Sequence, residues 1–488
     1  MNFNIFNSLG SAAHSFYCIL ELFRTKCQRP ALIALSTIVS VAALPIAGQA
    51  ADVYINVGEA NFKKSLMALP ECKYLGAAEK PSSAKSISLD LSSTLLNDLD
   101  STGYFQFVKQ DAYLEDPEKV GLKPAPGESN GFKYENWSKI GTEFLIRCGF
   151  SVIKGQITLK AFLYDVKKAK SIVAKEYSGP EDKVRKVAHT FANDVVEGLT
   201  GKPGYFLTRI VVGSDRGGNS WKEIYIMDWD AKNPKQITRH KSIALSPNWS
   251  PEGKKVAYTA YVVHTKSKKR NADLFTYEIF TGKRELISSR PGINSGAAFS
   301  PDGKHIFMTI SQAGSPDIFR VGSSGDGLKQ ITKGPAGAMY VEPAVSPDGK
   351  KIAFSSDRSG KPMVYTMDID GTNMKRITFA GKYNASPSWS PDGKKIAFAG
   401  FDKDHFDVFV MNADGTNMVR LTTEKKINGK MSNNEDPAFS PDGRQVMFVS
   451  DRTKNKQIYL INADGTNERR LTVDKHNYFK PKWSWVND

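Results

Sequence analysis

The side chains that most often carry catalysis or bind metals are sparse in this chain, and their spacing is unsuitable. No His-x-x-x-His or Glu–His pair stands at metal-binding spacing. The sequence also lacks a Gly-x-Ser-x-Gly nucleophile motif and a phosphate-binding loop. The histidines are His14, His189, His240, His264, His305, His405 and His476. We therefore predict that the protein is not an enzyme, with no catalytic residues, no metal and no cofactor.

Two other features look like sites but have simpler explanations. Residues 368–372 read Asp-x-Asp-Gly-Thr, like part of a calcium loop. A third ligand before the glycine and the distal glutamate are missing, and Asp-Gly between apolar runs is typical of a hairpin turn. Trp249, Trp389 and Trp483 could stack a ligand. They recur at one place in a repeat, however, which favours a position in the core between repeats.

That repeat dominates the chain and predicts its architecture. Variants of one phrase occur six times, 44 to 50 residues apart. They are PNWSPEGKKVAY from Pro247, AAFSPDGKHIFM from Ala297, PAVSPDGKKIAF from Pro343, PSWSPDGKKIAF from Pro387, PAFSPDGRQVMF from Pro437 and PKWSW from Pro481. A period in the forties made of short strands indicates a β-propeller in which each repeat is one four-stranded blade.

The two ends of the array predict how the ring closes. Residues 208–216 align with the second strand of a repeat and have no first strand before them. Residues 481–484 are a first strand with nothing after them. Together they make one blade, so we expect six blades, with the C-terminal strand pairing beside 207–213 and removing an open edge.

The first 200 residues differ from the repeats. Residues 1–50 read as a secretory signal peptide: basic residues precede an uncharged stretch that ends in Ala-Gly-Gln-Ala. A retained membrane anchor is the alternative. Residues 51–200 predict an α+β domain, and 205–488 form the propeller. The predicted strands of the α+β domain are 53–57, 105–108, 143–153, 156–166 and 171–177. Its predicted helices are 89–99 and 180–199, and 111–137 is predicted to be an exposed loop.

Export also bears on cysteine and charge. The exported chain keeps Cys72 and Cys148, which predict one disulfide, with two buried free thiols as the alternative. The net charge of the whole chain is +16. Basic blocks such as 266–270 (KSKKR) are typical of solvated loop tips, and export argues against nucleic acid. An anionic neighbour, such as an acidic protein surface, phospholipid or cell-wall polymer, stays open.

The first strand of each blade lines the central channel, so the segments that enter these strands converge at one mouth. These segments are 244–246, 293–296, 340–342, 384–386, 434–436 and 478–480. Side chains from six blades meeting in one place suit the docking of a protein or of an extended segment.

The leader, the small domain, HTFANDVVEGLTGKPGYFLTRIVV from His189, the six repeats and the terminal KPKWS together resemble the TolB family, periplasmic propellers of the Tol–Pal envelope system. The resemblance covers residues 52–488. It implies a periplasmic, non-enzymatic scaffold for outer-membrane integrity and cell division, monomeric and attached to membranes only through its partners.

The resemblance also implies two partner surfaces. A Pal-like peptidoglycan-associated lipoprotein would dock on the mouth at Ile293, Asn294, Gly296, Val341, Glu342, Asn384, Asp436 and Lys480. A TolA-like inner-membrane protein would bind the segment Asp52, Val53, Tyr54, Ile55, Asn56 and Val57. We hypothesise that this segment either pairs within the protein or is released to a partner's sheet. The lysine-rich stretch 264–270 is not a family feature. The alternative functions are a carbohydrate-active propeller and a cell-wall-binding propeller.

Overall fold

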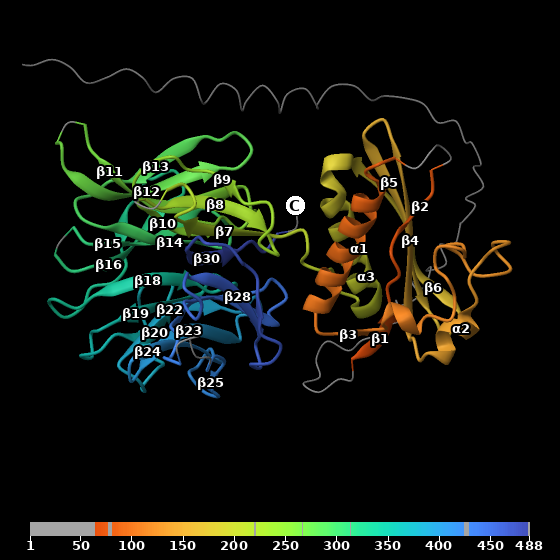
Figure 1. The fold of residues 1–488 in the computed structure, drawn as a ribbon. Coiled ribbons are helices and arrows are strands. Elements are labelled where there is room, and N and C mark those ends of the chain that lie inside the picture. Colours follow the sequence, from red (N-terminus) through yellow and green to blue (C-terminus); the bar gives the residue numbers. More distant parts are fainter. Residues whose placement is uncertain are drawn as a thin grey trace, which may run out of the picture. The chain divides into compact units, whose positions relative to one another are not determined.

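A computed structural model describes residues 64–76, 81–218, 221–265, 267–312, 314–423 and 429–486 (Figure 1). The predicted leader, 1–50, and the predicted strand 53–57 lie outside the described residues. No helix of the described part combines the length and the apolar character that a membrane span requires.

The N-terminal domain is a mixed sheet with the order β3-β1-β4-β5-β6, to which β2 adds beside β4. Its strands are β1 (Ser65–Ala68), β2 (Lys73–Tyr74), β3 (Phe105–Phe107), β4 (Phe144–Ile153), β5 (Gln156–Asp165) and β6 (Lys170–Pro180). Its helices are α1 (Ala84–Ser101), α2 (Tyr134–Lys139) and α3 (Val184–Thr200), with 3-10 turns at Gln110–Ala112 and Glu181–Lys183. In Figure 1, α1 and α3 lie side by side, and α3 packs on β5 and β6.

Both predicted long helices are present, but α1 begins five residues before the predicted start, and Asp98, which we expected to face water, is buried. Leu91, Leu95 and Leu99 of α1 are fully buried at a spacing of four residues, which aligns them along one helix face. Helix α3 begins four residues later than predicted because β6 continues to Pro180. It ends at Gly201, whose φ of 71° only glycine adopts at little cost.

The prediction that 111–137 is an exposed loop is wrong in its second half. Phe132 and Trp137 are buried, and Trp137 belongs to α2. The indole Nε1 of Trp137 donates to Glu115 Oε2 at 3.0 Å. The buried guanidinium of Arg147 donates to three main-chain carbonyls of this segment, including that of Pro117 at 2.8 Å. The segment is therefore fastened to the sheet despite its polar composition.

The predicted disulfide is present. Cys72, directly before β2, is bonded to Cys148 in β4, with their Cα atoms 4.7 Å apart. The bridge holds the short β2, which pairs with β4 at only Lys73 and Tyr74. Both cysteines are buried in the domain core.

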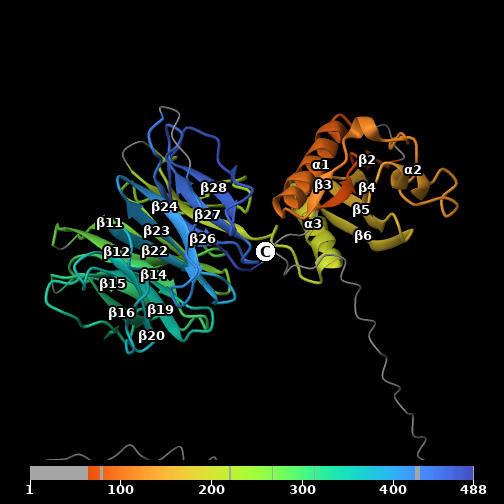
Figure 2. The same ribbon diagram turned by 90° about the horizontal axis from the view of Figure 1, so that it is seen from below.

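The propeller has six sheets of four strands each, which confirms the six predicted blades (Figures 1 and 2). The blade closed by both ends of the array contains β30 (Tyr478–Trp483), β7 (Arg209–Ser214), β8 (Glu223–Asp228) and β9 (Lys235–Gln236). The second blade contains β10 (Ala244–Trp249), β11 (Lys255–Val263), β12 (Arg270–Glu278) and β13 (Arg284–Ser288). The third blade contains β14 (Asn294–Phe299), β15 (His305–Ile310), β16 (Asp317–Gly322) and β17 (Lys329–Gln330). The next is β18 (Tyr340–Val345), β19 (Lys351–Ser356), β20 (Met363–Asp368), β21 (Lys375–Arg376). The fifth blade contains β22 (Tyr383–Trp389), β23 (Lys395–Asp402), β24 (His405–Asn412) and β25 (Val419–Arg420). The sixth blade contains β26 (Asn434–Phe439), β27 (Gln445–Ser450), β28 (Gln457–Asn462) and β29 (Arg469–Arg470).

The C-terminal strand closes the ring as predicted. Strand β30 pairs antiparallel with β7, placing Trp483 opposite Ile210, and the two lie side by side in Figure 1. Every first strand contacts the first strands of both neighbouring blades, so the six line the central channel.

The turn at 368–372 is a hairpin turn, also as predicted. Asp370 Oδ1 accepts the backbone N–H of Thr372 at 3.0 Å and its hydroxyl at 2.6 Å. The flanking strands β20 and β21 pair directly. Both hydrogen bonds that the Asp370 carboxylate accepts come from Thr372 within the turn, as in an Asx-type turn.

Candidate binding site at the channel mouth

Each first strand carries a bulge at the same position. The register against the second strand shifts in all six blades. The first bulged residue has a positive φ every time: Ser246 (52°), Gly296 (65°), Glu342 (55°), Ser386 (53°), Asp436 (57°) and Lys480 (47°). We call these six residues the bulge ring. Such a backbone costs about 1–3 kcal/mol for each non-glycine residue, and strain of this kind is concentrated at functional sites.

Side chains of the bulge ring bind one another across the channel. Lys480 Nζ lies 2.5 Å from Glu342 Oε1 and 3.4 Å from Asp436 Oδ1. The backbone N–H of Ser386 donates to Glu342 Oε2 at 2.8 Å, and that of Lys480 donates to Asp436 Oδ2 at 3.1 Å. One cation thus bridges two carboxylates contributed by different blades.

This arrangement keeps the three groups charged. Burial alone would raise the pKa of Glu342 and of Asp436, but Lys480 outweighs it and the pKa of each carboxyl is lowered. Burial would lower the pKa of Lys480, but Asp436 and Glu342 together raise it. The site is therefore a fixed network of opposite charges at neutral pH.

Lys482, two residues further along β30, has a different environment. Burial and the neighbouring charge of Lys480 lower the pKa of Lys482, and the channel carboxylates oppose this only in part. Within the described part of the chain its Nζ has no hydrogen-bond or ion-pair partner. Sequence reasoning missed this residue, because nothing in KPKWS distinguishes the second lysine from the first.

The bulge ring borders a cavity of about 300 Å³ at one mouth of the channel. Six of the eight mouth residues named from the sequence line it: Ile293, Gly296, Val341, Glu342, Asp436 and Lys480. Lys482, Tyr383 and several prolines complete the wall. Ile293 is 42 % exposed at the rim, so the cavity combines an apolar edge with a charged floor.

The other two residues are buried below the surface. Asn294 Nδ2 donates to the carbonyls of Ala272 and Arg290, at 2.9 and 2.7 Å, and its Oδ1 accepts from Ser288. Asn384 Nδ2 donates to the carbonyl of Ala380 at 2.9 Å. Both amides hold the segment that leads into a first strand, so they shape the mouth from below.

The opposite end of the channel has a cavity of about 370 Å³ lined by prolines and tryptophans. Trp249 and Trp389 are buried, and each indole donates to a main-chain carbonyl in the first strand of another blade. Trp249 Nε1 donates to the carbonyl of Lys482 at 3.1 Å, and Trp389 Nε1 donates to that of Ala344 at 2.9 Å. The prediction that the tryptophan series belongs to the core between blades is confirmed.

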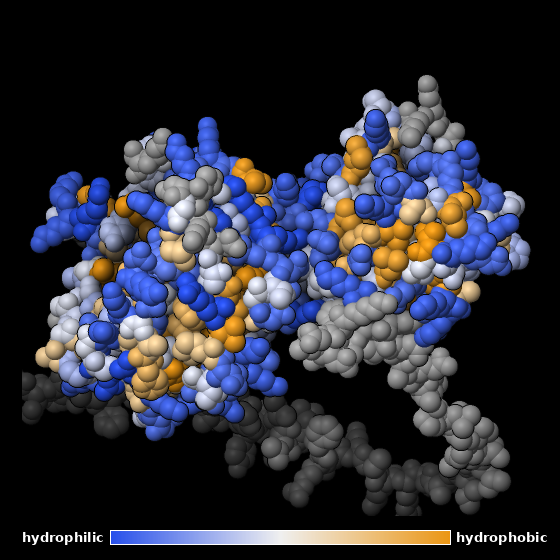
Figure 3. Space-filling model, turned by 60° about the horizontal axis from the view of Figure 1, so that its bottom comes forward, coloured by the Kyte–Doolittle hydropathy of each residue, from blue (hydrophilic) through white to orange (hydrophobic). Residues whose placement is uncertain are grey.

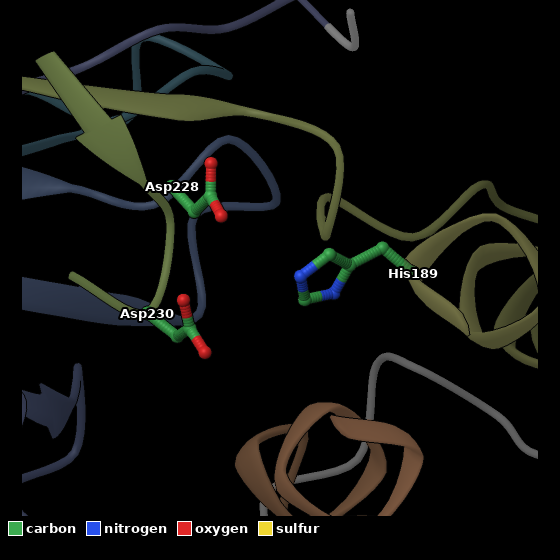
Figure 4. A group of neighbouring side chains, drawn as sticks. All are labelled: His189, Asp228 and Asp230. Carbon is green, nitrogen blue, oxygen red and sulfur yellow. The ribbon is translucent and has the colours of Figure 1, made fainter. Parts of the chain in front are cut away.

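A second charged group connects the N-terminal domain to the propeller. His189 of α3 faces Asp228 and Asp230, which lie at and after the end of β8 (Figure 4), with one ligand atom of each within 4.8 Å of the others. The guanidinium of Arg185 lies 2.5 Å from Asp230 Oδ2 and 3.4 Å from His189 Nε2. Arg185 therefore supplies the positive charge that a metal would bring.

Asp98 of α1 completes this group. Its Oδ2 lies 2.6 Å from His189 Nδ1, and burial raises the pKa of Asp98 to about 6 against the opposing effect of His189. The result is a chain of contacts from α1 through α3 to the propeller. Histidine spacing along the sequence gave no sign of it, because its members come from three separate elements.

Comparisons with known proteins agree with this architecture. The family model described as TolB beta propeller domain matches residues 196–425 and 384–488, and that described as TolB amino-terminal domain matches 53–172. The Tol-Pal system protein TolB of Desulfosudis oleivorans is 34% identical over 280 residues, 57% of this chain and 60% of its own length. The protein TolB homolog of Chlorobaculum tepidum is 35% identical over 249 residues, 51% of this chain and 52% of its own length. The chain thus spans between half and two thirds of these relatives.

Among solved structures, TolB from Acinetobacter baumannii covers 87% of this chain and 97% of its own, with a TM-score of 0.69 and 24% identity. At that identity the likeness concerns the fold alone. Neither matching family model describes an enzyme.

Proposed function

Because the chain belongs to the TolB family, we propose that it is a non-enzymatic scaffold of the Tol–Pal envelope system. It acts in the periplasm after removal of residues 1–50 and contributes to outer-membrane integrity and cell division. A Pal-like lipoprotein docks on the channel mouth, and a TolA-like protein binds residues 52–57.

The mouth cavity is the observation that carries the Pal-like interaction. Six bulges, five of them strained, bring residues from every blade to one place, and Ile293 offers an exposed apolar contact beside it. A partner that docks there would bury Ile293, and a few buried anchor residues of this kind supply most of the binding energy of a protein interface. The channel carboxylates Glu342 and Asp436 are already bound by Lys480, which leaves them poorly suited to acid–base catalysis on a glycan.

The first experiment measures binding of residues 51–488 to the periplasmic domain of the organism's own Pal-like lipoprotein by isothermal titration calorimetry. Ile293→Glu should weaken binding by about tenfold or more, because it places a charge at an apolar contact. The control is Phe280→Glu: Phe280 is 71 % exposed but lies in the turn between β12 and β13, away from the mouth cavity. Equal loss in both variants, or no wild-type binding, would contradict the proposal.

The TolA-like interaction is tested separately by deleting residues 52–57. The deletion should abolish binding to the TolA-like partner and leave affinity for the Pal-like domain within about twofold. If the deleted protein keeps both partners, the N-terminal segment is not the second binding surface.

A further inference from the structure

The two faces of the propeller differ in charge. In most blades the turn between the second and third strands is hydrogen-bonded to the segment that enters the next first strand. For example, the backbone N–H of Lys222 donates to the carbonyl of Ser242, and the backbone N–H of Tyr478 donates to the carbonyl of Lys456. These turns and segments therefore form one face, which contains the mouth cavity. The turns from the first to the second strand lie on the opposite face.

Basic residues dominate the mouth face. The described segments that enter the first strands carry seven basic residues and one acidic residue, Asp474; the basic ones are Arg239, Lys241, Arg290, Lys333, Lys382, Lys430 and Lys475. The turns between the second and third strands add four acidic residues, each next to a basic one in the sequence: Asp215, Asp357, Asp404 and Asp451. On the opposite face, each Ser-Pro-Asp-Gly or Ser-Pro-Glu-Gly turn carries one acidic and one basic residue, such as Asp392 with Lys394. In the view of Figure 3, hydrophilic residues predominate and apolar residues gather in separate patches.

One hairpin extends the basic surface beyond the other blades. Strands β11 and β12 pair over nine residues, up to Val263 opposite Arg270, whereas the corresponding strands of the other blades pair over six to eight. Lys268, Lys269 and Arg270 are exposed near its tip and form no ion pair within the described residues. We call residues 261–265 and 267–272 the basic arm.

The basic arm is attached to the rim of the mouth. Ala272 forms a bridge with Ile293, and the side chain of Asn271 accepts from the N–H of Gly292 at 3.0 Å and donates to the carbonyl of Arg290 at 2.9 Å. The base of the arm therefore stands beside the apolar contact Ile293, and its lysines follow along the hairpin on the same face.

We propose that the mouth binds an acidic protein segment, whose carboxylates pair with the basic arm at the rim and with Lys482 in the channel. This inference rests on the proposed function and adds the chemistry of the partner. Charge complementarity of this kind mainly accelerates association and selects the partner. Lys482 can receive a carboxylate because its ammonium has no partner among the described residues, whereas the ammonium of Lys480 is already bound to Glu342 and Asp436.

A protein segment fits the mouth better than a membrane surface. Lys482 lies inside the channel, where a lipid headgroup in a bilayer does not reach. The cavity walls also include Ile293, Val341 and Tyr383, which suit the apolar side chains of a peptide.

The test uses residues 51–488 and fluorescein-labelled decaglutamate, with binding followed by fluorescence anisotropy at low salt. Lys268→Glu with Lys269→Glu should weaken binding about tenfold, and Lys482→Gln about threefold, since each removes contacts with carboxylates. Lys350→Glu with Lys394→Glu makes the same change of net charge on the opposite face and should stay within about twofold of wild type. Circular dichroism and melting temperature verify that each variant is folded.

Equal weakening by the arm pair and the opposite-face pair would overturn the proposal, because net charge alone would then explain binding. The proposal would also fall if phosphatidylglycerol vesicles, but not decaglutamate, bound with dependence on Lys268 and Lys269.

A parallel series with the Pal-like domain separates this inference from the proposed function. If that domain does not bind while decaglutamate binds as expected, the Pal assignment fails and an acidic partner is supported. If it binds and its association rate is unchanged in the arm variant, the acidic-segment proposal fails and the scaffold function stands.

Discussion

Replacing Trp483 by alanine should destabilise the propeller more than any other single change at the C-terminal strand. Trp483 is 5 % exposed, and its indole Nε1 donates to Thr208 Oγ1 at 2.7 Å. Its ring packs edge-on against Tyr205, with centroids 5.4 Å apart, and parallel to Trp229 at 6.5 Å. One side chain therefore joins the closing strand to both the first blade and the linker.

The expected loss follows from these contacts. Truncating a buried large aromatic residue to alanine costs about 3–5 kcal/mol in free energy of unfolding. The hydroxyl of Thr208 keeps its bond to the carbonyl of Tyr205, so a lost hydrogen-bond partner adds little. Trp485→Ala is the matched control: Trp485 is 46 % exposed and should cost less than about 1 kcal/mol.

Thermal unfolding of residues 51–488 followed by far-ultraviolet circular dichroism measures both variants. For a domain of this size, 3–5 kcal/mol corresponds to a fall in melting temperature on the order of 10 °C. Near-equal shifts for Trp483→Ala and Trp485→Ala would refute the reasoning, since ring closure would then not depend on this buried contact.

Three further outcomes are expected. Changing Cys72 and Cys148 together to alanine should cost about 4 kcal/mol, because the bridge closes a loop with a sequence separation of 76, and denaturant titration measures this. Asp98 has a pKa of about 6 in the folded protein and 3.8 in the unfolded chain, so the proton on Asp98 stabilises the fold at low pH. Relative to Asp98→Asn, the wild type should therefore lose up to about 3 kcal/mol in free energy of unfolding as the pH rises from 4 to 7. Parallel curves of stability against pH for the two proteins would contradict this. Deleting 481–488 removes the pairing of Lys482 and Trp483 with one edge of β7 and should produce oligomers by size-exclusion chromatography, whereas a monomer with wild-type melting would show that another segment covers this edge.

Repetition made the propeller predictable from sequence. Six copies of one phrase report strand number and turn type, and the unequal ends of the array predict the pairing of β30 with β7. In the N-terminal domain, the helical spacing of leucines predicted α1. The polar composition of 111–137 gave no sign of α2, because Trp137 of that helix contacts Glu115, 22 residues earlier in the chain, and such a contact cannot be predicted from local composition.

The details of the mouth were harder to predict. Nothing in Ser-Pro, Glu-Pro or Lys-Pro indicates that the residue before proline has a positive φ, since isolated residues there prefer extended backbone. The ring of bulges is a tertiary property, imposed where six strands converge. The pairing of Lys480 with Glu342 has the same origin, because these residues are 138 positions apart.

Closure of the ring has a consequence for when the protein becomes competent to bind. The N–H of Arg209 donates to Ser484 Oγ across 275 residues, so the first blade is completed by a segment that is synthesised long after the other strands of that blade. Contacts this distant form slowly, and the edge of β7 stays open until they do. Lys480 and Lys482 reach the channel on the same strand, β30. A chain whose β30 has not yet docked therefore lacks these two channel lysines, and we expect it to bind a partner at the mouth more weakly than the closed ring does.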